Sequence, residues 1–479
     1  MGFFYERRKR MSSESAAKTK KAKKMKMPHI YVLLISITII CAAASWFLPA
    51  GEFERALSDA GREMVVPGTY HVIESTPVGF FTLVQSIYNG TVDAAGVIFF
   101  VFISYASIGL IIASGAFNGL VASMLRILKG SARAIIIPVF ITLIGCASST
   151  IGVFEEMFPF IPIFVGIAIA MGYDAIVGLA IVALGTGLGY SGAVMNPFTV
   201  GMAQSIADIP QMSGAGYRII CHAVMIAVAS FFVVRYALKI QADPTKSLVY
   251  GDDFSSLTMD SDHIENKQFG IREKLVLATL VAGIVVIVWG TKTKGWYFAE
   301  LSAVFLLMGL VSGFIMGWGP NEIAEKVAKS FSEIAVACMM IGIARGILVV
   351  LQAGHIIDTI VYYLSIPLSN LPGAISAIAM FLVQTGINFF IPSGSGQAVT
   401  SMPIMAPLAD LIGISRQSAV LAFQFGDGLS NIIWPTSMTP IICGIAGVKI
   451  EKWWKWFVPV FIVLVLTQSI LMAVSVVIW

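Results

Sequence analysis

Long apolar segments constrain this chain more than any other feature of its sequence. Segments 30–48, 94–113 and 457–479 are each close to the roughly 20 residues that a helix needs to cross the hydrocarbon core of a bilayer. Charged residues make up only 12% of the 479 residues, about half the usual share in a soluble domain. The sequence therefore predicts an all-α polytopic membrane protein that is embedded in a lipid bilayer.

The charge and cysteine patterns exclude other classes of protein. The net charge of +4 comes from residues 1–28, which contain ten Lys or Arg and two acids, so we expect no nucleic-acid partner. All five cysteines lie within apolar segments and lack metal-ligand spacing. We therefore expect no disulfide, no bound zinc and no cofactor.

One unusual pattern occurs in both halves of the chain. Ser148-Ser149-Thr150 and Ser393-Gly394-Ser395 are each followed twelve residues later by a proline, and then by a Gly-x-Gly-Leu motif. The two Ser-containing segments are 245 residues apart, and the two Gly-x-Gly-Leu motifs are 241 apart. Helix breakers at corresponding positions of two membrane-embedded halves indicate the binding site of a transporter. We predict re-entrant hairpins at 131–170 and 372–412, and broken spans at 174–207 and 416–440.

The distribution of basic residues predicts the orientation of the chain. If the N-terminus is cytoplasmic and neither hairpin crosses the membrane, 24 Lys and Arg lie inside and 6 lie outside, as the positive-inside rule requires. We expect a multi-pass protein of a bacterial inner or plasma membrane. Its nine full spans would be 30–50, 93–114, 174–207, 214–238, 275–290, 298–317, 333–352, 416–440 and 456–479.

These boundaries divide the chain into two repeats of opposite orientation. Inverted repeats support alternating access, because each half can adopt the conformation of the other. The expected segments are a basic cytosolic tail at 1–28, a first repeat at 29–240, a cytosolic linker at 241–272, a linking span at 273–297 and a second repeat at 298–479.

The hairpin tips supply the first part of the candidate binding site. They offer hydroxyl groups and, at Gly394, access to the backbone. The N-terminus of each second hairpin leg carries a partial positive charge that suits a substrate carboxylate. Packing of small residues between membrane helices is the structural alternative. The tip residues that we expect to contact substrate are Ser148, Ser149, Thr150, Ser393, Gly394 and Ser395.

The broken spans supply further polar groups. Asn196-Pro197 predicts a helix N-cap followed by proline at the first helical position, and segment 435–440, with Thr436 and Ser437, predicts the same in the second half. Glycines from Gly185 to Gly192 would free carbonyl groups for a cation or an ammonium group. Asn388, Gln397 and Asn431 are candidate polar contacts, for which hydrogen bonding between helices is an equally good explanation.

Three acids lie where a carboxylate is costly and usually functional. Glu155 and Glu156 follow the first tip, and Asp427 lies in the second broken span. Arg345 is the expected charge partner, but one arginine cannot neutralise three acids. A cationic substrate, protons or Na⁺ near Gly187 and Asp427 could supply the remaining charge, and we expect no other metal.

Several segments resemble a known family of carriers. They include Gly172-Tyr173-Asp174, Gly342-Ile343-Ala344-Arg345-Gly346 and the stretches 192–198, 388–397, 402–408 and 422–428. Over roughly 28–479 the chain resembles the YfcC-like carriers, which are grouped with anaerobic C4-dicarboxylate carriers in the ion-transporter superfamily. The resemblance implies a homodimeric elevator, with a scaffold domain and a transport domain that holds both hairpins and both broken helices. It also implies arginine–ornithine exchange for some members.

These observations favour a secondary carrier for amino acids, preferably basic ones, that works as an exchanger or an ion-coupled carrier. The α-carboxylate would contact the hairpin tips, and the cationic end would contact Glu155, Glu156 or Asp427. The alternative is a Na⁺- or proton-coupled C4-dicarboxylate carrier. An intramembrane enzyme is a third hypothesis, which the sequence disfavours because no histidine adjoins the serines.

Overall fold

The computed structural model describes residues 28–57, 63–66, 68–117, 130–255, 257 and 270–479. The predicted basic tail up to residue 27, and residues 256 and 258–269 of the predicted linker at 241–272, lie outside these ranges. The first half of the described chain contains α2 (Ile30–Ala44), β1 (Gly51–Glu52), β2 (Arg55–Leu57), β3 (Glu63–Val65), β4 (His71–Val72), α3 (Phe80–Asp93), α4 (Ala95–Ala113), η1 (Gly130–Ile135), α6 (Ile136–Ile151), η2 (Glu155–Phe160), α7 (Ile161–Ala170), α8 (Ala175–Ser191), η3 (Pro197–Gly201), α9 (Met202–Ile206), α10 (Ala215–Ala242) and η4 (Pro244–Lys246). The second half contains α12 (Ile271–Lys294), α13 (Phe298–Met316), α14 (Pro320–Ala353), α15 (Ile357–Ser365), η5 (Ile366–Asn370), α16 (Gly373–Phe390), α17 (Gly394–Leu411), α18 (Arg416–Ser430), α19 (Thr439–Ile445) and α20 (Ile450–Ile478).

The described residues include eight helices that are long and apolar enough to cross a membrane. Six of these coincide with predicted spans, and two are first legs of the predicted hairpins. The predicted span 30–50 is too long, because α2 ends at Ala44. Segments 174–207 and 416–440 are interrupted near Gly192 and Asn431, as expected for broken spans. The predicted span 333–352 begins too late, because α14 is continuous from Pro320 to Ala353.

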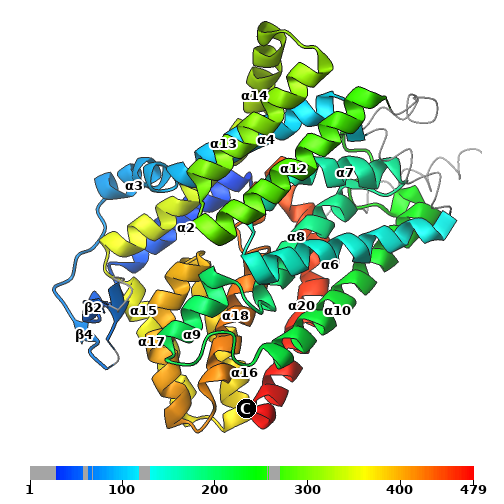
Figure 1. The fold of residues 1–479 in the computed structure, drawn as a ribbon. Coiled ribbons are helices and arrows are strands. Elements are labelled where there is room, and N and C mark those ends of the chain that lie inside the picture. Colours follow the sequence, from blue (N-terminus) through cyan, green and yellow to red (C-terminus); the bar gives the residue numbers. More distant parts are fainter. Residues whose placement is uncertain (1–27, 58–62, 67, 118–129, 256, 258–269) are drawn as a thin grey trace, which may run out of the picture.

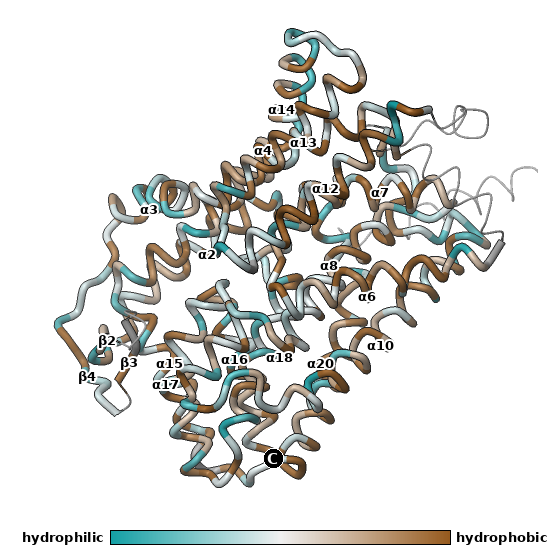
Figure 2. Tube along the Cα trace, viewed as in Figure 1, coloured by the Kyte–Doolittle hydropathy of each residue, from teal (hydrophilic) through white to brown (hydrophobic). Residues whose placement is uncertain are grey.

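The helices form two groups (Figure 1). In the first group α14 packs against α2, α3 and α4, and α13 packs against α4 and α12. The second group contains α6 to α10 and α16 to α20, in which α8 and α18 contact each other and the helices around them. Hydrophobic residues run along α6, α10 and α12, as expected for helices surrounded by lipid (Figure 2).

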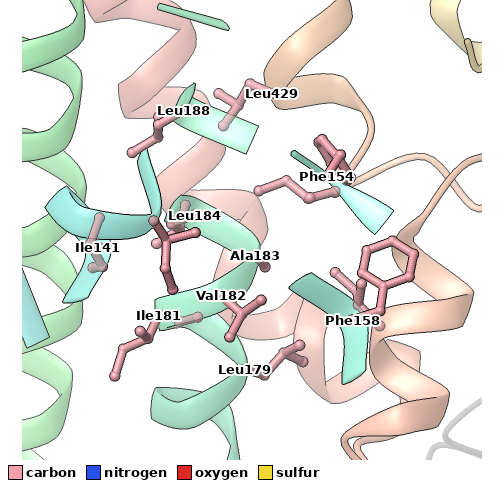
Figure 3. Packing of buried hydrophobic residues seen from close by; sticks show 14 of the residues in the cluster. Ile141, Phe154, Phe158, Leu179, Ile181, Val182, Ala183, Leu184, Leu188 and Leu429 are labelled. Carbon is pink, nitrogen blue, oxygen red and sulfur yellow. The ribbon is translucent and has the colours of Figure 1, made fainter. Parts of the chain in front are cut away.

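Corresponding helices of the two halves pack antiparallel. Ser191 on α8 lies beside Gly428 on α18, and Gly187 lies beside Ile432. Tyr217 near the start of α10 donates a hydrogen bond to the carbonyl of Leu471 near the end of α20. Buried apolar side chains, among them Leu184, Leu188 and Leu429, surround the α8–α18 contact (Figure 3).

The structure corrects the register between the two copies. The left-handed residues Gly172 and Gly413, and the helix N-caps Asp174 and Ser415, are each separated by 241 residues. The ends of α7 and α17 have the same separation. The predicted match of Ser148 with Ser393 at 245 residues is therefore wrong by four positions, because similar small residues allow both alignments in sequence alone.

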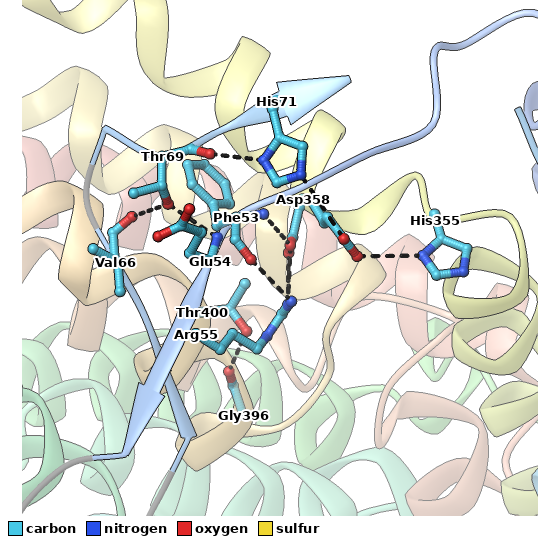
Figure 4. Close-up of polar contacts among 11 residues, drawn as sticks. Phe53, Glu54, Arg55, Val66, Thr69, His71, His355, Asp358, Gly396 and Thr400 are labelled. Atoms are coloured by element: carbon cyan, nitrogen blue, oxygen red, sulfur yellow. Dashed lines mark hydrogen bonds and ion pairs between the residues drawn. The ribbon is translucent and has the colours of Figure 1, made fainter. Parts of the chain in front are cut away.

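Four short strands occupy the described part of the segment between α2 and α3. β1 pairs with β4 and β2 pairs with β3, both antiparallel. Asp358 on α15 accepts hydrogen bonds from the backbone N–H of Phe53 at 3.0 Å and from the Arg55 guanidinium at 2.9 Å (Figure 4). These contacts tie the strands to α15.

The α8–α18 contact leads to the first prediction. A Cβ on Gly428 would collide with the backbone nitrogen of Ser191, so Gly428→Ala should destabilise the protein by about 1–3 kcal/mol through overpacking. The midpoint of thermal unfolding in detergent measures the change. Gly386→Ala on α16 is the control, because nothing lies within 4 Å of that Cβ and alanine favours a helix. Equal midpoints for the two variants would contradict the packing argument.

Candidate functional site

A cavity of about 330 Å³ lies where the two helix groups meet. The first group contributes Asp93, Arg345 and the start of α13 to its lining. The second group contributes both hairpin tips and both helix breaks. Predicted site residues that line the cavity are Glu155, Glu156, Ser393, Gly394, Ser395, Asn431, Thr436 and Ser437, together with Arg345.

The first tip lies further along the chain than predicted. α6 continues through Ile151 and ends at Gly152, whose φ of 85° is left-handed, so the turn is formed by residues 152–154. A Cβ on Gly152 would also lie 2.6 Å from Oδ1 of Asn196, which explains the glycine. Ser148, Ser149 and Thr150 therefore lie in the last turn of α6 rather than at the tip.

Ser148, Ser149 and Asn196 join the first hairpin to the α8 break. Ser148 Oγ donates to the carbonyl of Thr186 at 3.0 Å, and Ser149 Oγ donates to the carbonyl of Gly192 at 3.2 Å and accepts from the N–H of Val194 at 3.0 Å. The predicted N-cap is confirmed, since Asn196 Oδ1 accepts from the N–H groups of Phe198 and Thr199. None of the three is among the residues that line the cavity.

The glycines of α8 serve packing rather than cation binding. α8 is continuous from Ala175 to Ser191, so the carbonyl groups around Gly185, Gly187 and Gly189 remain within the helix. Cβ atoms on Gly185 and Gly189 would run into Ile144 and Ser148 of α6. The expectation that these glycines free carbonyl groups is wrong, because a glycine can allow close approach without breaking a helix.

The second tip ends in a capped helix N-terminus that faces the cavity. Ser393 is the N-cap of α17, and its hydroxyl accepts from the N–H of Gly396 at 3.3 Å. The first N–H groups of any α-helix lack partners within the helix, so those of Gly394 and Ser395 can donate to an anion. Thr436 and Ser437 do not cap α19, because their hydroxyls donate to Phe389 O and Asn431 Oδ1.

A buried polar network lies behind the second tip. The amide nitrogen of Asn388 is within 3.1 Å of Asp427 Oδ1, 3.2 Å of Gln397 Oε1 and 3.3 Å of Asn431 Oδ1. Ser430 donates to Asn388 Oδ1 at 2.7 Å. Asn388, Gln397 and Asp427 are fully buried, so they support the cavity instead of lining it.

Two oxygens beside this network have no hydrogen-bond partner in the described structure. They are Asp427 Oδ2 and Thr199 Oγ1, and both side chains are fully buried. A Cβ on Gly394 would lie 3.0 Å from Asp427 Oδ2 and 2.8 Å from the methyl group of Thr199. Unpaired buried oxygens are costly, so a ligand, ion or proton at this place would lower the free energy.

The acids of the first tip have different surroundings. Glu156 Oε2 accepts from the N–H of Phe154 at 2.8 Å, which stabilises the turn. Among the described residues, no other side chain or backbone group pairs with the carboxylate of Glu155, which lines the cavity. Glu155 is therefore the carboxylate that is most available to a substrate.

Arg345 does not pair with Glu155, Glu156 or Asp427, the acids expected to be its partners. Its guanidinium forms an ion pair with Asp93, the last residue of α3. Asp93 is missing from the residues predicted above. The available signal was its position as the single charged residue of segment 76–93, directly before a long apolar run.

Aromatic side chains of the cavity were also missed by the sequence prediction. Tyr190 donates to the carbonyl of Gly152 at 2.9 Å and packs edge-on against Phe154. Phe198, Tyr297 and Phe298 complete this wall. In an apolar sequence nothing distinguishes such residues from those that face lipid. In the part of the chain that the structure describes, no cluster of three His, Cys, Asp or Glu side chains could hold a metal.

The hydrogen bonds of Ser149 generate a second prediction. Ser149→Ala would leave the buried carbonyl of Gly192 unpaired, and should lower the free energy of unfolding by about 1–3 kcal/mol. The N–H of Val194 would lose one of its two acceptors and keep the backbone carbonyl of Ser149. Thr150→Ala is the control, because that hydroxyl is exposed and bonds only within its own helix. Thermal unfolding measures stability, and ligand affinity should remain within about twofold. A large loss of affinity without loss of stability would instead make Ser149 a contact residue.

Comparisons with known proteins identify relatives of this chain in two bacteria. The chain is 29% identical to an uncharacterized protein of Haemophilus influenzae, over 96% of this chain and 98% of that protein. It is also 29% identical to the Escherichia coli protein named "Putative basic amino acid antiporter YfcC", over 91% and 94%.

Two solved structures are similar at lower sequence identity. MtrF of Neisseria gonorrhoeae matches with a TM-score of 0.45 and 17% identity, over 94% of this chain and 96% of that chain. The YdaH transporter of Alcanivorax borkumensis matches with a TM-score of 0.42 and 16% identity, over 93% and 98%. The sequence model of the C4-dicarboxylate anaerobic carriers, DcuC, matches residues 27–477. This chain therefore belongs to the C4-dicarboxylate anaerobic carrier family, and it is a multi-pass membrane transporter and not an enzyme.

Proposed function

We propose that this protein is a secondary active transporter of amino acids with a preference for basic ones, which it exchanges across the membrane. The observation that carries the proposal is the charge of the cavity. Asp93, Glu155 and Glu156 line it, and Arg345 is the one cationic side chain among its described lining residues. Since Arg345 is paired with Asp93, two carboxylates remain uncompensated.

The cationic end of the substrate would bind at Glu155. That carboxylate has no partner from another described residue, whereas Glu156 already accepts the N–H of Phe154. Aromatic faces beside it, such as Tyr190, also favour a cation. The name of the E. coli relative, a basic amino acid antiporter, agrees with this choice of substrate.

The α-carboxylate of the substrate would bind at the N-terminus of α17. The N–H groups of Gly394 and Ser395 and the hydroxyl of Ser393 lie there, with the favourable end of the helix dipole. In this arrangement the two hairpin tips bind opposite ends of one amino acid. Ser148, Ser149, Thr150 and Asn196 would then act indirectly, by holding the first tip in place.

We assign the first helix group to a scaffold domain and the second to a transport domain of an elevator. Antiparallel packing of α8 with α18 and of α10 with α20 supports inverted repeats. The cavity at the boundary between the groups would be exposed to either side as one group moves. A cytoplasmic N-terminus and a homodimer, both expected from the sequence, remain parts of this proposal.

A second candidate function is a C4-dicarboxylate carrier coupled to Na⁺ or protons, which the family name favours. The buried oxygens of Asp427 and Thr199 support a coupling cation at the second break. They do not supply the surplus positive charge that a dianion needs. We therefore assign the cation to coupling and retain amino acids as the substrate.

Exchange in proteoliposomes tests the substrate. Loaded vesicles should take up labelled arginine against internal ornithine, and unlabelled arginine should compete far better than succinate. Glu155→Gln should lower arginine affinity about 10- to 100-fold, because a charge-assisted hydrogen bond contributes roughly 1.5–3 kcal/mol. The affinity for citrulline, the neutral analogue of arginine, should fall much less.

The control for this variant is Glu325→Gln, which removes an exposed acid of α14 outside the cavity. Arginine affinity should then stay at the wild-type value. Uptake of succinate without uptake of arginine would refute the proposed substrate.

The proposed cation site has its own test. Na⁺ should raise the thermal unfolding midpoint of the wild type above that in choline chloride of equal ionic strength, because a ligand that binds only the folded state stabilises it. Asp427→Asn and Thr199→Val should lose this response. A midpoint that responds to pH but not to Na⁺ would indicate a proton. An equal Na⁺ response in all three proteins would remove both residues from the site.

A further inference from the structure

Asp93 and Arg345 form the only charge pair among the described residues that line the cavity. Both belong to the first helix group, whereas the other acids that line the cavity are at the first hairpin tip. Their side chains are 49% and 32% exposed, so the pair faces the cavity and is accessible to a bound molecule. Neither residue caps a helix or bonds to another described side chain, apart from the bonds within the pair.

The backbones that carry the pair are held in close contact. A Cβ on Gly90 of α3 would lie 2.7 Å from the carbonyl oxygen of Gly342 and 2.8 Å from Cα of Gly346, both on α14. Gly90 precedes Asp93 by three residues, and Gly342 and Gly346 lie on either side of Arg345. Because α3 and α14 touch through their backbones here, packing fixes the separation of the two backbones and keeps the Asp93 and Arg345 side chains within reach of each other. The glycines of segment 342–346 thus position Arg345 beside Asp93.

We infer that Asp93 is a specificity-determining residue, whose carboxylate masks Arg345 and so makes the cavity select cationic over neutral and anionic substrates. This inference rests on the proposed function and adds a filter from the opposite wall of the cavity. With Asp93 ionised, Arg345 offers no unpaired positive charge to a second carboxylate. Without that carboxylate, Arg345 becomes an anion-binding group, since a guanidinium pairs well with carboxylates.

The test is Asp93→Asn, measured by competition against labelled arginine with protein in nanodiscs. Unlabelled arginine, citrulline and glutamate are the competitors. The ratio of the inhibition constant for glutamate to that for arginine should fall about tenfold or more relative to wild type. The corresponding ratio for citrulline should fall by a smaller factor. The charge-swapped variant Asp93→Arg with Arg345→Asp restores the pair and should return the ratio toward the wild-type value.

Asp410→Asn is a closely matched control. Asp410 pairs with Arg416 at 2.7 Å, and the exposures of 50% and 32% resemble those of the cavity pair, but neither residue lines the cavity. This variant should leave the ratio unchanged. An equal shift in Asp410→Asn would overturn the inference, because the effect would then follow from the loss of any surface charge.

Two further outcomes are decisive. The inference is overturned if the ratio is unchanged in Asp93→Asn. It is also overturned if Asp93→Asn and the charge-swapped variant both lose affinity for all three ligands to the same extent, because the pair would then be structural. If the wild type binds no labelled arginine but binds labelled glutamate or succinate in a direct binding measurement, the proposed function fails instead. The wild-type measurement therefore separates failure of the substrate assignment from failure of the filter.

Discussion

The backbone contact between α8 and α18 is the constraint on which the site depends. Gly428 lies against Ser191, and Gly187 lies against Ile432, where the two chain halves cross. A side chain at Gly428 would separate the helices and move both breaks, at Gly192 and Asn431, away from each other. The same approach brings Thr199, on the far side of the first break, next to Gly394 and Asp427.

Around this crossing the two halves perform different tasks with related geometry. Both hairpins place a turn at the cavity, at residues 152–154 and 391–393. The first turn presents Glu155 and Glu156, while the second presents the N-terminus of α17 with few side-chain atoms. One tip therefore offers negative charge and the other offers hydrogen-bond donors. This difference suits a molecule with one carboxylate and one cationic group, and it could not arise from two identical repeats.

Much of the architecture could be predicted because it follows from the lipid bilayer, which acts as the solvent of this chain. A bilayer requires apolar helices of a known length, so the positions of α4, α10, α13 and α20 are evident from hydropathy. The Asn196 cap was predictable because capping is local chemistry. The tip of the first hairpin was not, since a run of small residues can either end a helix or continue it. Close packing of α8 on α6 decides in favour of continuation through Ser148 and Ser149.

The sequence by itself determined that this chain is an all-helical membrane protein, with helix breakers at similar places in its two halves and acids at different places in each. Those properties depend on residues near one another in the chain, and on a solvent that penalises unpaired backbone. Only the tertiary structure decided that Glu155 lines the cavity, and that Asn388 and Asp427 lie behind it. It also decided that Arg345 pairs with Asp93, 252 residues away. Such pairings depend on which helix faces are brought together, and helix faces are chosen by packing across the whole molecule.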